Sequence, residues 1–212
     1  MVHDRLLDIA IREFGEKGLD GASTRSIASA AGTAMSSITY HYGSKQGLYL
    51  AVADYIAEHM ASEMLPVLDL ANTAPLRDPQ AARAKIHHIL NAFAQRMMGQ
   101  KSAALSMFIM REQLHPGEAF DRLYEAAMGQ VLDYLSELVA VATDAPADER
   151  TRLFAFLLAA QVFSLRSARG ALLRVAGQTA TEGPFAQSLT SLISFNTDAM
   201  LDRLHADRQE TA

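Results

Sequence analysis

The sequence predicts an all-α protein in which a small amino-terminal helix-turn-helix unit precedes a larger helical domain. Apolar residues recur at helical spacing along most of the chain, Gly and Pro interrupt the pattern, and no segment shows the alternation typical of a strand. We expect about nine helices. With 212 residues, half of them apolar and 20% charged, the chain can bury a substantial core.

The composition narrows the function classes. The chain has no Cys, which excludes disulfides, thiolate metal sites and Cys nucleophiles and agrees with a reducing compartment. The amino terminus shows no apolar signal segment, and the longest uncharged apolar stretch, residues 153–165, is shorter than the roughly 20 residues that cross a bilayer. We therefore expect a cytoplasmic protein without a membrane partner.

Charge is distributed unevenly along the chain. The net charge is −5, but residues 1–50 carry five basic and five acidic side chains, so the acidic excess lies downstream. No Asp or Glu occurs between Asp20 and Asp54. Because carboxylates would repel phosphate groups, this segment suits contact with nucleic acid.

The first predicted helices are short. Helix one covers about residues 4–17 and ends at Gly18, which can adopt the positive φ that closes a helix. Ser23 is a good N-cap for a second helix that ends at Gly32, and a third helix directs Ile38 inward. Helices this short depend on tertiary packing for stability.

The remaining helices are separated by Pro and Gly. A fourth helix is expected to end at about residue 65, where Pro66 and the segment 72–79 mark a linker. Asp78 and Pro79 then supply an N-cap and a first helical position. Further helical patterns cover about residues 79–99, 102–114, 117–142, 146–175 and 184–205.

Residues 23–42 meet the requirements of a helix-turn-helix. The two helices cross closely, which needs a small residue at the crossing, a Gly in the turn and an apolar anchor, supplied in order by Ala28, Gly32 and Ile38. The outer face of the third helix is free of acids, and its side chains can donate to phosphates or base edges. The alternative is a solvated face of a small helical domain.

The run from Gly21 to Tyr49, with its Tyr-His-Tyr and Gly-Ser-Lys elements, resembles the signature of the TetR/AcrR family of transcriptional regulators. The resemblance implies phosphate contacts by Thr24, Tyr40, His41 and Lys45, and base reading by Met35, Ser36, Ser37 and Thr39. It also implies a core that includes Phe14, Ile27, Tyr42 and Leu48. The full predicted DNA-contact set is Ser23, Thr24, Arg25, Met35, Ser36, Ser37, Thr39, Tyr40, His41 and Lys45.

Two residues depart from the family pattern. Ala34 stands where a capping Ser is frequent, so we expect Thr33 to take the cap of helix three. Thr39 stands where an aromatic residue is usual, and this resembles the CecR branch of the family, as do residues 111–116 and 163–177. The resemblance implies a DNA-binding domain at residues 1–50 and a ligand-binding and dimerisation domain at residues 51–212.

The segment 153–175 is apolar around much of its circumference and carries small residues that permit close helix approach. It forms either the centre of a monomeric bundle or, as the family resemblance implies, a dimer contact with the last helix around Leu189, Leu192, Ile193 and Met200. We expect a homodimer, because two heads about 34 Å apart read a palindrome.

Methionines and aromatic residues of the larger domain could line an apolar pocket, although such residues more often form core. Polar residues among them could orient a ligand or pair with one another. The predicted ligand-contact residues are Met97, Met107, Phe108, Arg111, Glu112, His115, Phe120, Tyr124, Phe163 and Arg166.

A second hypothesis is a helical small-molecule-binding or metal-dependent protein that does not bind DNA. Glu112 and His115 have the Glu-x-x-His spacing of a di-iron centre, but this motif occurs once. No nucleophile elbow or phosphate-binding loop is present. We predict no enzyme activity, cofactor or metal, and favour a repressor that binds a palindromic operator and is released by a small-molecule inducer.

Overall fold

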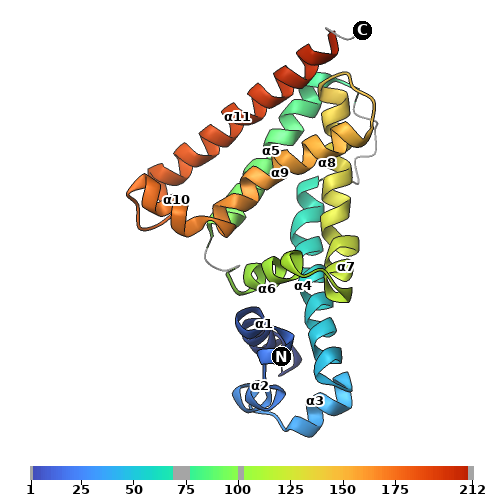
Figure 1. Ribbon diagram of the computed structural model, residues 1–212, viewed down its shortest axis with the longest axis vertical. Helices are drawn as coiled ribbons and strands as arrows, with labels where there is room; N and C mark the ends of the chain where they lie inside the picture. The colour runs from blue at the N-terminus through green and yellow to red at the C-terminus, as the bar shows by residue number, and fades with distance from the viewer. Residues whose placement is uncertain (1, 69–76, 100–102, 210–212) are drawn as a thin grey trace. The chain divides into compact units, whose positions relative to one another are not determined.

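The computed structural model describes residues 2–68, 77–99 and 103–209, and every regular element within these ranges is helical (Figure 1). The elements are α1 (Val2–Gly21), α2 (Thr24–Ala31), α3 (Met35–Tyr42), α4 (Lys45–Leu68), α5 (Pro79–Met98), α6 (Ala103–Leu114), α7 (Glu118–Leu123), the π-helical turn η1 (Tyr124–Met128), α8 (Gly129–Ala142), α9 (Glu149–Ser167), α10 (Arg169–Ala176) and α11 (Gly183–Gln209). Each predicted helix is present, and the all-α fold class is confirmed. Most of the linker predicted at 72–79 lies outside the described residues.

Some helix ends differ from the predicted ones. The fourth helix does not end before Pro66 but continues to Leu68, because a proline in the last turn removes a single backbone hydrogen bond. α9 begins after the predicted position at 146, since Asp148 is its N-cap and forms a capping box with Thr151. The Asp148 carboxylate accepts from the Thr151 backbone N–H at 3.0 Å, and the Thr151 hydroxyl accepts from the Asp148 N–H at 2.9 Å.

The chain packs into two compact units. Unit 1 comprises residues 1–63 and 101–129, and unit 2 comprises residues 64–100 and 130–212. The packing of unit 1 therefore includes α6 and α7 together with the amino-terminal helices. The predicted boundary between a DNA-binding domain at residues 1–50 and a second domain at residues 51–212 does not coincide with these packing units and stays a prediction.

The core of unit 1 is centred on three aromatic rings. The ring centroids of Phe14 and Tyr49 are 4.9 Å apart, and those of Tyr49 and Phe108 are 4.8 Å apart. Ile27 and Leu48 are also buried there, while Tyr42 is partly buried at the edge. These contacts bring α1, α4 and α6 together around one apolar centre.

Two features of the helices in unit 1 arise from local backbone geometry. α1 is kinked at Gly18, which has the positive φ predicted for it (72°), and then continues to Gly21. At the carboxy-terminal end of unit 1, the chain passes through the π turn η1. A Cβ at Gly129, the residue after this turn, would lie 3.2 Å from the Tyr124 carbonyl oxygen. The π turn explains why the predicted helix over 117–142 is divided into three elements.

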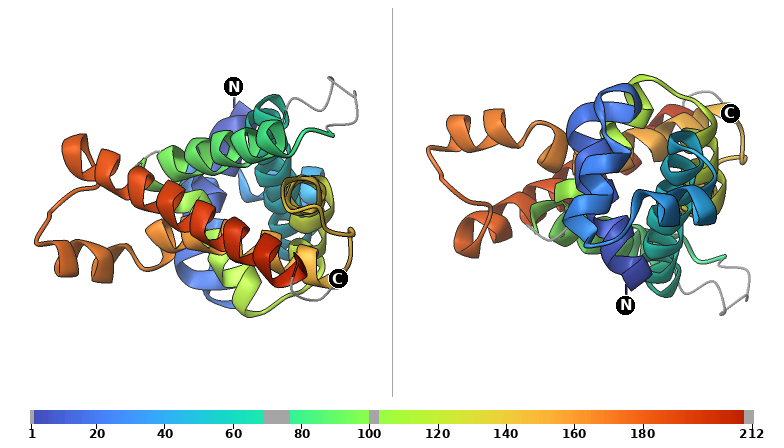
Figure 2. Two further views of the ribbon diagram at one scale, coloured as in Figure 1. Left: turned by 90° about the horizontal axis from the view of Figure 1, so that it is seen from above. Right: turned by 90° about the horizontal axis from the view of Figure 1, so that it is seen from below.

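In unit 2, α5 packs against α9 and α11 (Figures 1 and 2). Buried apolar side chains come from these helices and from α8, among them Ile86, Leu135, Leu158 and Leu201. α10 carries no buried residue and extends away from the rest of this unit (Figures 1 and 2). Across the described ranges, no helix combines the length and apolar character needed to cross a membrane.

Candidate nucleic-acid interface

α2 is defined by a cap at each end. The Ser23 hydroxyl accepts a hydrogen bond from the Ser26 backbone N–H at 3.3 Å, which satisfies one of the free donors of the first turn. Gly32 then closes the helix in the left-handed conformation with φ 69°. A Cβ there would meet nothing within 4 Å, so the positive φ alone favours Gly.

α3 begins without a side-chain cap. Its N-cap is Ala34, in an extended conformation, and no side-chain hydrogen bond is formed there. The expectation that Thr33 takes the cap is therefore wrong, because the chain enters the helix one residue later. Packing holds α3 in place instead: Ile38 is 2% exposed in the core of unit 1.

The opposite face of α3 is open to solvent. Tyr40 is 85% exposed and Met35 is 51% exposed. The remaining predicted contact residues of this helix are Ser36, Thr39 and His41, which are exposed, and Ser37, which is partly buried. Figure 1 shows α2 and α3 as consecutive short helices that lead into α4. The helix thus presents hydroxyls, a thioether and two rings without a carboxylate.

The amino terminus of α2 adds backbone N–H groups to this surface. Ser23 and Arg25 are exposed and Thr24 is partly exposed. The first turn contains no acidic residue, so the positive end of the helix dipole is not neutralised there. This arrangement suits an anion such as a backbone phosphate.

The start of α4 is held by side chains. The Ser44 hydroxyl accepts from the Gly47 N–H at 3.0 Å. The Lys45 ammonium donates to the carbonyl oxygens of Asp20 at 3.1 Å and Ala22 at 3.3 Å. Lys45, which the resemblance implies as a phosphate contact, therefore has bonds within the protein.

The predicted ligand residues are divided between the two units. Unit 1 contains Met107, Phe108, Arg111 and Glu112 on α6, His115 just after the end of α6, Phe120 on α7 and Tyr124 on η1. Met97, Phe163 and Arg166 lie in unit 2. Within each unit, several of these side chains form hydrogen bonds or ring contacts with other residues of the same unit.

On α6, two charged members of this set join neighbouring helices. Arg111 donates to the carbonyl oxygens of Gly15 at 3.4 Å and Glu16 at 3.1 Å, next to the kink of α1. Glu112 is buried and accepts a hydrogen bond from the Tyr49 hydroxyl of α4. Burial, together with the hydrogen bond to Glu112 and its charge, raises the pKa of Tyr49.

The apolar and aromatic members vary in burial. Phe108 is fully buried, whereas Met107 is 46% exposed and Tyr124 is 41% exposed. The Phe120 and Tyr124 rings are 5.9 Å apart. Phe108 is therefore a core residue in this structure, whereas Met107 and Tyr124 are open to solvent.

In unit 2, the Phe163 ring stacks on Phe93 with centroids 6.4 Å apart. The Arg166 guanidinium donates to the carbonyl oxygens of Gly99 and Arg96. Burial and, to a smaller extent, the charge of Arg169 lower the pKa of Arg166. Arg166 thus links α9 to the end of α5.

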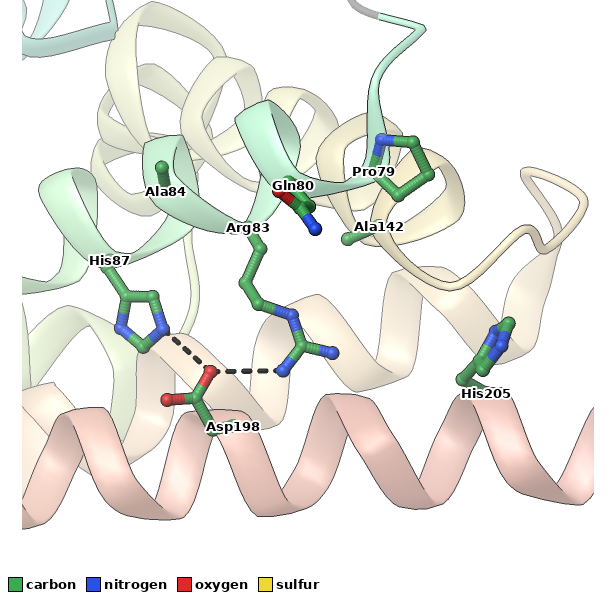
Figure 3. Close-up of a pocket in the computed structure, with 8 residues that line it drawn as sticks. All are labelled: Pro79, Gln80, Arg83, Ala84, His87, Ala142, Asp198 and His205. Carbon is green, nitrogen blue, oxygen red and sulfur yellow. Dashed lines mark hydrogen bonds and ion pairs between the residues drawn. The ribbon is translucent and has the colours of Figure 1, made fainter.

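The structure also contains a recess that sequence reasoning missed. It lies in unit 2 between α5, α8 and α11, and Figure 3 shows its lining residues Pro79, Gln80, Arg83, Ala84, His87, Ala142, Asp198 and His205. Residues of α5 and α11 that meet here are more than a hundred positions apart, so a single sequence gives no signal for their contact. The spacing of Arg83 and His87 places both on one face of α5 but does not identify their partner on α11.

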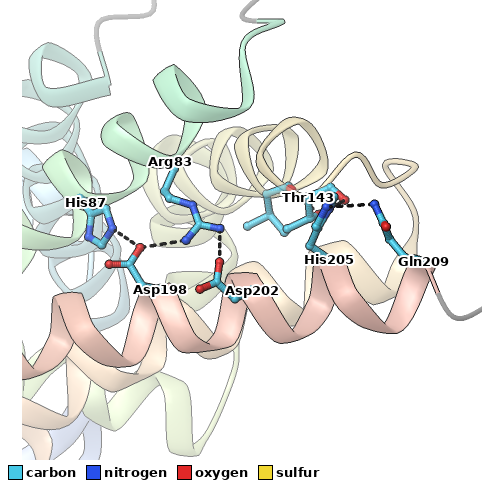
Figure 4. Close-up of polar contacts among 8 residues, drawn as sticks. Arg83, His87, Thr143, Asp198, Asp202, His205 and Gln209 are labelled. Carbon is cyan, nitrogen blue, oxygen red and sulfur yellow. Dashed lines mark hydrogen bonds and ion pairs between the residues drawn. The ribbon is translucent and has the colours of Figure 1, made fainter.

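Most charges of the recess are paired with one another (Figure 4). Arg83 donates to Asp198 at 3.1 Å and to Asp202 at 2.6 Å, and the His87 ring lies 2.9 Å from Asp198. Burial raises the pKa of Asp198, but the combined effect of His87 and Arg83 is larger, so its pKa lies below the usual value. The network therefore joins α5 to α11.

The residues suggested for a metal site do not come together. Glu112 is bound by Tyr49, and His115 is exposed at the end of α6. Over the described residues, there is no group of three or more His, Asp or Glu side chains that could hold a metal ion.

Comparison with known proteins agrees with the geometry of the helix-turn-helix. Residues 6–52 match the family described as bacterial regulatory proteins, tetR family, and residues 82–204 match the carboxy-terminal domain of the helix-turn-helix-type transcriptional dual regulator CecR. The CecR protein of Shigella flexneri is 30% identical over 205 residues, covering 94% of this chain and 91% of the relative. The regulatory protein RaaS of Mycobacterium tuberculosis is 30% identical over 151 residues, covering 71% of this chain and 63% of the relative.

Solved structures share the fold at lower identity. A transcriptional regulator from Pseudomonas aeruginosa has a TM-score of 0.67 at 22% identity, with 96% of this chain and 89% of that chain covered. AibR, solved in complex with isovaleryl coenzyme A and operator DNA, has a TM-score of 0.65 at 15% identity, with 97% and 98% covered. The chain belongs to the TetR family of bacterial transcriptional regulators, and its larger domain is of the CecR type.

Proposed function

We propose that this protein is a homodimeric repressor that binds a palindromic operator and is released by a small-molecule inducer. The observation that carries DNA binding is the exposed face of α3, which has no acid and is anchored by the buried Ile38. A recognition helix needs this combination, because its inner face has to be fixed while its outer face enters the major groove.

The contacts are proposed to divide by position. Thr24, Tyr40, His41 and Lys45 bind phosphates and set the position of the head on the duplex, together with the N–H groups of α2. Met35, Ser36, Ser37 and Thr39 face base edges from the first turns of α3. The Thr39 hydroxyl lies 3.4 Å from the Met35 carbonyl oxygen, a weak bond that it can exchange for a base.

The proposed dimer uses α9 and α11. Leu153, Phe156 and Leu157 on α9 are 57%, 52% and 53% exposed. Leu192 and Phe195 on α11 are 63% and 74% exposed. We call these five side chains the α9/α11 face. Large apolar groups exposed on neighbouring helices favour a second copy as partner, since isologous contact buries the same patch on both chains.

In the sequence, Leu189, Leu192, Ile193 and Met200 are the expected dimer residues of the last helix. Leu192 belongs to the α9/α11 face, whereas Leu189 and Ile193 are each 8% exposed and lie in the core of unit 2. Phe195, which was not among the expected residues, is instead the second exposed apolar side chain of α11 in this face. Helical periodicity identifies an apolar face but does not reveal which of two apolar faces is covered within the chain.

Ligand response is supported by the family and by the neighbour AibR, whose structure holds both isovaleryl coenzyme A and operator DNA. We place the inducer site in residues 51–212. If inducer and operator oppose each other, linkage requires that operator weaken inducer binding by the same factor by which inducer weakens operator binding, typically worth about 1–3 kcal/mol.

A mobility-shift titration on duplexes selected from random DNA tests the DNA-binding part. We expect saturable binding that weakens steeply as salt rises, because phosphate contacts release counterions. Absence of salt-dependent duplex binding would refute the proposed DNA binding and would favour the alternative, a helical small-molecule-binding or metal-dependent protein. Equal inducer affinities with and without operator would leave DNA binding intact and refute the inducer step.

A further inference from the structure

The helix-turn-helix lacks the side chains that most often distinguish bases in the major groove. Between Arg25 and Lys45 the sequence contains no Arg, Lys, Asn, Gln, Asp or Glu. Guanine is commonly read by Arg or Lys, and adenine by Asn or Gln, through two hydrogen bonds to one base edge. Cytosine is read by Asp or Glu, which accept from its amino group. α3 therefore has none of these side chains with which to identify a base.

Hydroxyl groups form most of the predicted base-reading set. Ser36 and Thr39 are exposed and Ser37 is partly buried. A hydroxyl both donates and accepts, so it can bond to an acceptor or a donor on a base edge. The hydroxyls of α3 therefore do not by themselves determine which base is read.

A large apolar side chain, that of Met35, stands at the first position of α3. It is 51% exposed, and Ala34, the N-cap residue before it, is also exposed. In helix-turn-helix proteins, residues at the amino-terminal end of the recognition helix contact base edges. An exposed apolar side chain thus occupies a position from which bases are read.

Thymine is the base that matches such a side chain. In the major groove, thymine presents a C5-methyl group next to its O4 acceptor, and apolar side chains contact this methyl group. Met is unbranched and flexible, so its thioether can adapt to the position of a methyl group on the duplex. Contact would remove apolar surface of both groups from water, which favours binding.

We propose that Met35 reads a thymine in each half-site of the operator through the C5-methyl group. This inference rests on the proposed function, because it names the base that one residue of the α3 face recognises. Sequence preference at this position then depends on a methyl group, and not on a pair of hydrogen bonds from α3 to a purine.

Uracil in place of thymine tests the contact, because the exchange removes the methyl group and keeps the O4 acceptor. The duplex is one that the wild-type protein enriches from random DNA, and each thymine of a half-site is replaced in turn. We expect one position at which uracil weakens binding about fourfold, the factor that corresponds to one buried methyl group. Replacement in both half-sites should weaken binding about sixteenfold, since separated positions contribute roughly additively.

Variants of Met35 identify the side chain that contacts the methyl group. Met35→Ser should bind the thymine and uracil duplexes equally, and it should keep the thermal midpoint of wild type because the side chain is half exposed. Met35→Leu is the matched control, since it keeps an apolar side chain and should still prefer thymine. Tyr40→Phe should weaken binding to both duplexes alike and keep the fourfold ratio, because Tyr40 is proposed to bind phosphate.

The possible results separate this inference from the proposed function. A selected half-site without thymine, or equal binding of wild type to thymine and uracil at every position, would overturn the inference and leave DNA binding intact. A preference for thymine that persists in Met35→Ser would assign the methyl contact to another side chain and would also overturn it. If the wild-type protein enriches no duplex, the proposed function itself fails, and the contact of Met35 with thymine fails with it.

Discussion

The pair formed by Tyr49 and Glu112 shows how one buried hydrogen bond joins distant parts of unit 1. Tyr49 and Glu112 are 5% and 6% exposed, and the phenol lies between the rings of Phe14 and Phe108. A buried carboxyl group needs a donor, and the phenol supplies it. Loss of that donor leaves a desolvated acceptor without a partner.

Tyr49→Phe is therefore expected to lower the free energy of unfolding by about 1–3 kcal/mol, although it removes a single oxygen atom. Denaturant unfolding at neutral pH measures this. A Tyr49→Phe, Glu112→Gln double mutant is the control, because the Gln amide no longer presents a buried charge. Unchanged stability in Tyr49→Phe would contradict the importance of the pair.

The same pair predicts a dependence on alkaline pH. The pKa of Tyr49 is raised above the ordinary value of 10.0, so the unfolded chain loses this proton first as the pH rises. The contribution to stability is present below pH 10 and is lost above it, by up to about 1.4 kcal/mol per pH unit. Wild type should lose stability more steeply than Tyr49→Phe in this range. Parallel curves would contradict the raised pKa.

Side chains of α3 should differ in what they do to binding. Tyr40→Phe removes a hydroxyl proposed to bind phosphate and is expected to weaken all duplexes by a similar factor. Ser37→Ala is expected to change the preferred sequence at one position of each half-site, with about 1–3 kcal/mol of discrimination lost there. Binding-site selection with each variant measures both. A changed sequence preference in Tyr40→Phe alone would reverse these assignments.

At the scale of elements, hydrophobic periodicity and capping residues predicted the helix ends and turns that depend on neighbours in the sequence. The positive φ of Gly18, the cap at Ser23 and the turn at Gly32 are local, and each was predicted, although α1 continues past Gly18 to Gly21. The π turn and the break at Ala168 were not, because neither residue pattern is a recognised helix-breaking signal. The exposed face of α3 was predictable because Ile38, the buried residue of this helix, fixes which side turns inward.

The ligand-contact set illustrates the limit of this reasoning. Glu112 has the chemistry of a ligand contact, but its partner Tyr49 is 63 positions away in the sequence. Arg83 and Asp198 are separated by 115 positions. A single sequence does not reveal which of many polar residues will meet across such distances. It therefore does not distinguish a polar side chain that pairs within the protein from one that contacts a ligand.

Contact between α1 and α6 leads to a prediction for glycine substitutions. A Cβ at Gly15 would lie 3.2 Å from the Ala104 carbonyl oxygen, whereas one at Gly170 in α10 would meet nothing within 4 Å. Alanine raises helix propensity by about 1 kcal/mol in a helix interior such as that around Gly15, and by less at Gly170 in the first turn of α10. We expect Gly170→Ala to be neutral or stabilising and Gly15→Ala to be destabilising by about 1 kcal/mol, because overpacking exceeds the gain. Thermal unfolding of the two variants compares them, and equal stabilisation would refute close packing of α1 on α6.

At the scale of the whole molecule, the proposed dimer depends on the α9/α11 face. Phe195→Asp places a charge on a side chain that is 74% exposed, so folding should persist while association fails. Val175→Asp is the matched control, since Val175 is 89% exposed on α10 and lies outside this face. Sedimentation should give a monomer for Phe195→Asp and a dimer for the control. A dimeric Phe195→Asp protein would place the interface elsewhere.

A selection of bound duplexes from random DNA tests the central claim most directly, because it examines recognition and symmetry together. We predict enrichment of an inverted repeat whose half-site centres lie about one helical turn, or about 34 Å, apart. The Phe195→Asp variant should enrich a single half-site weakly or not at all. Failure of the wild-type protein to enrich any sequence, or enrichment of an asymmetric site, would contradict a dimeric regulator that reads DNA through α3.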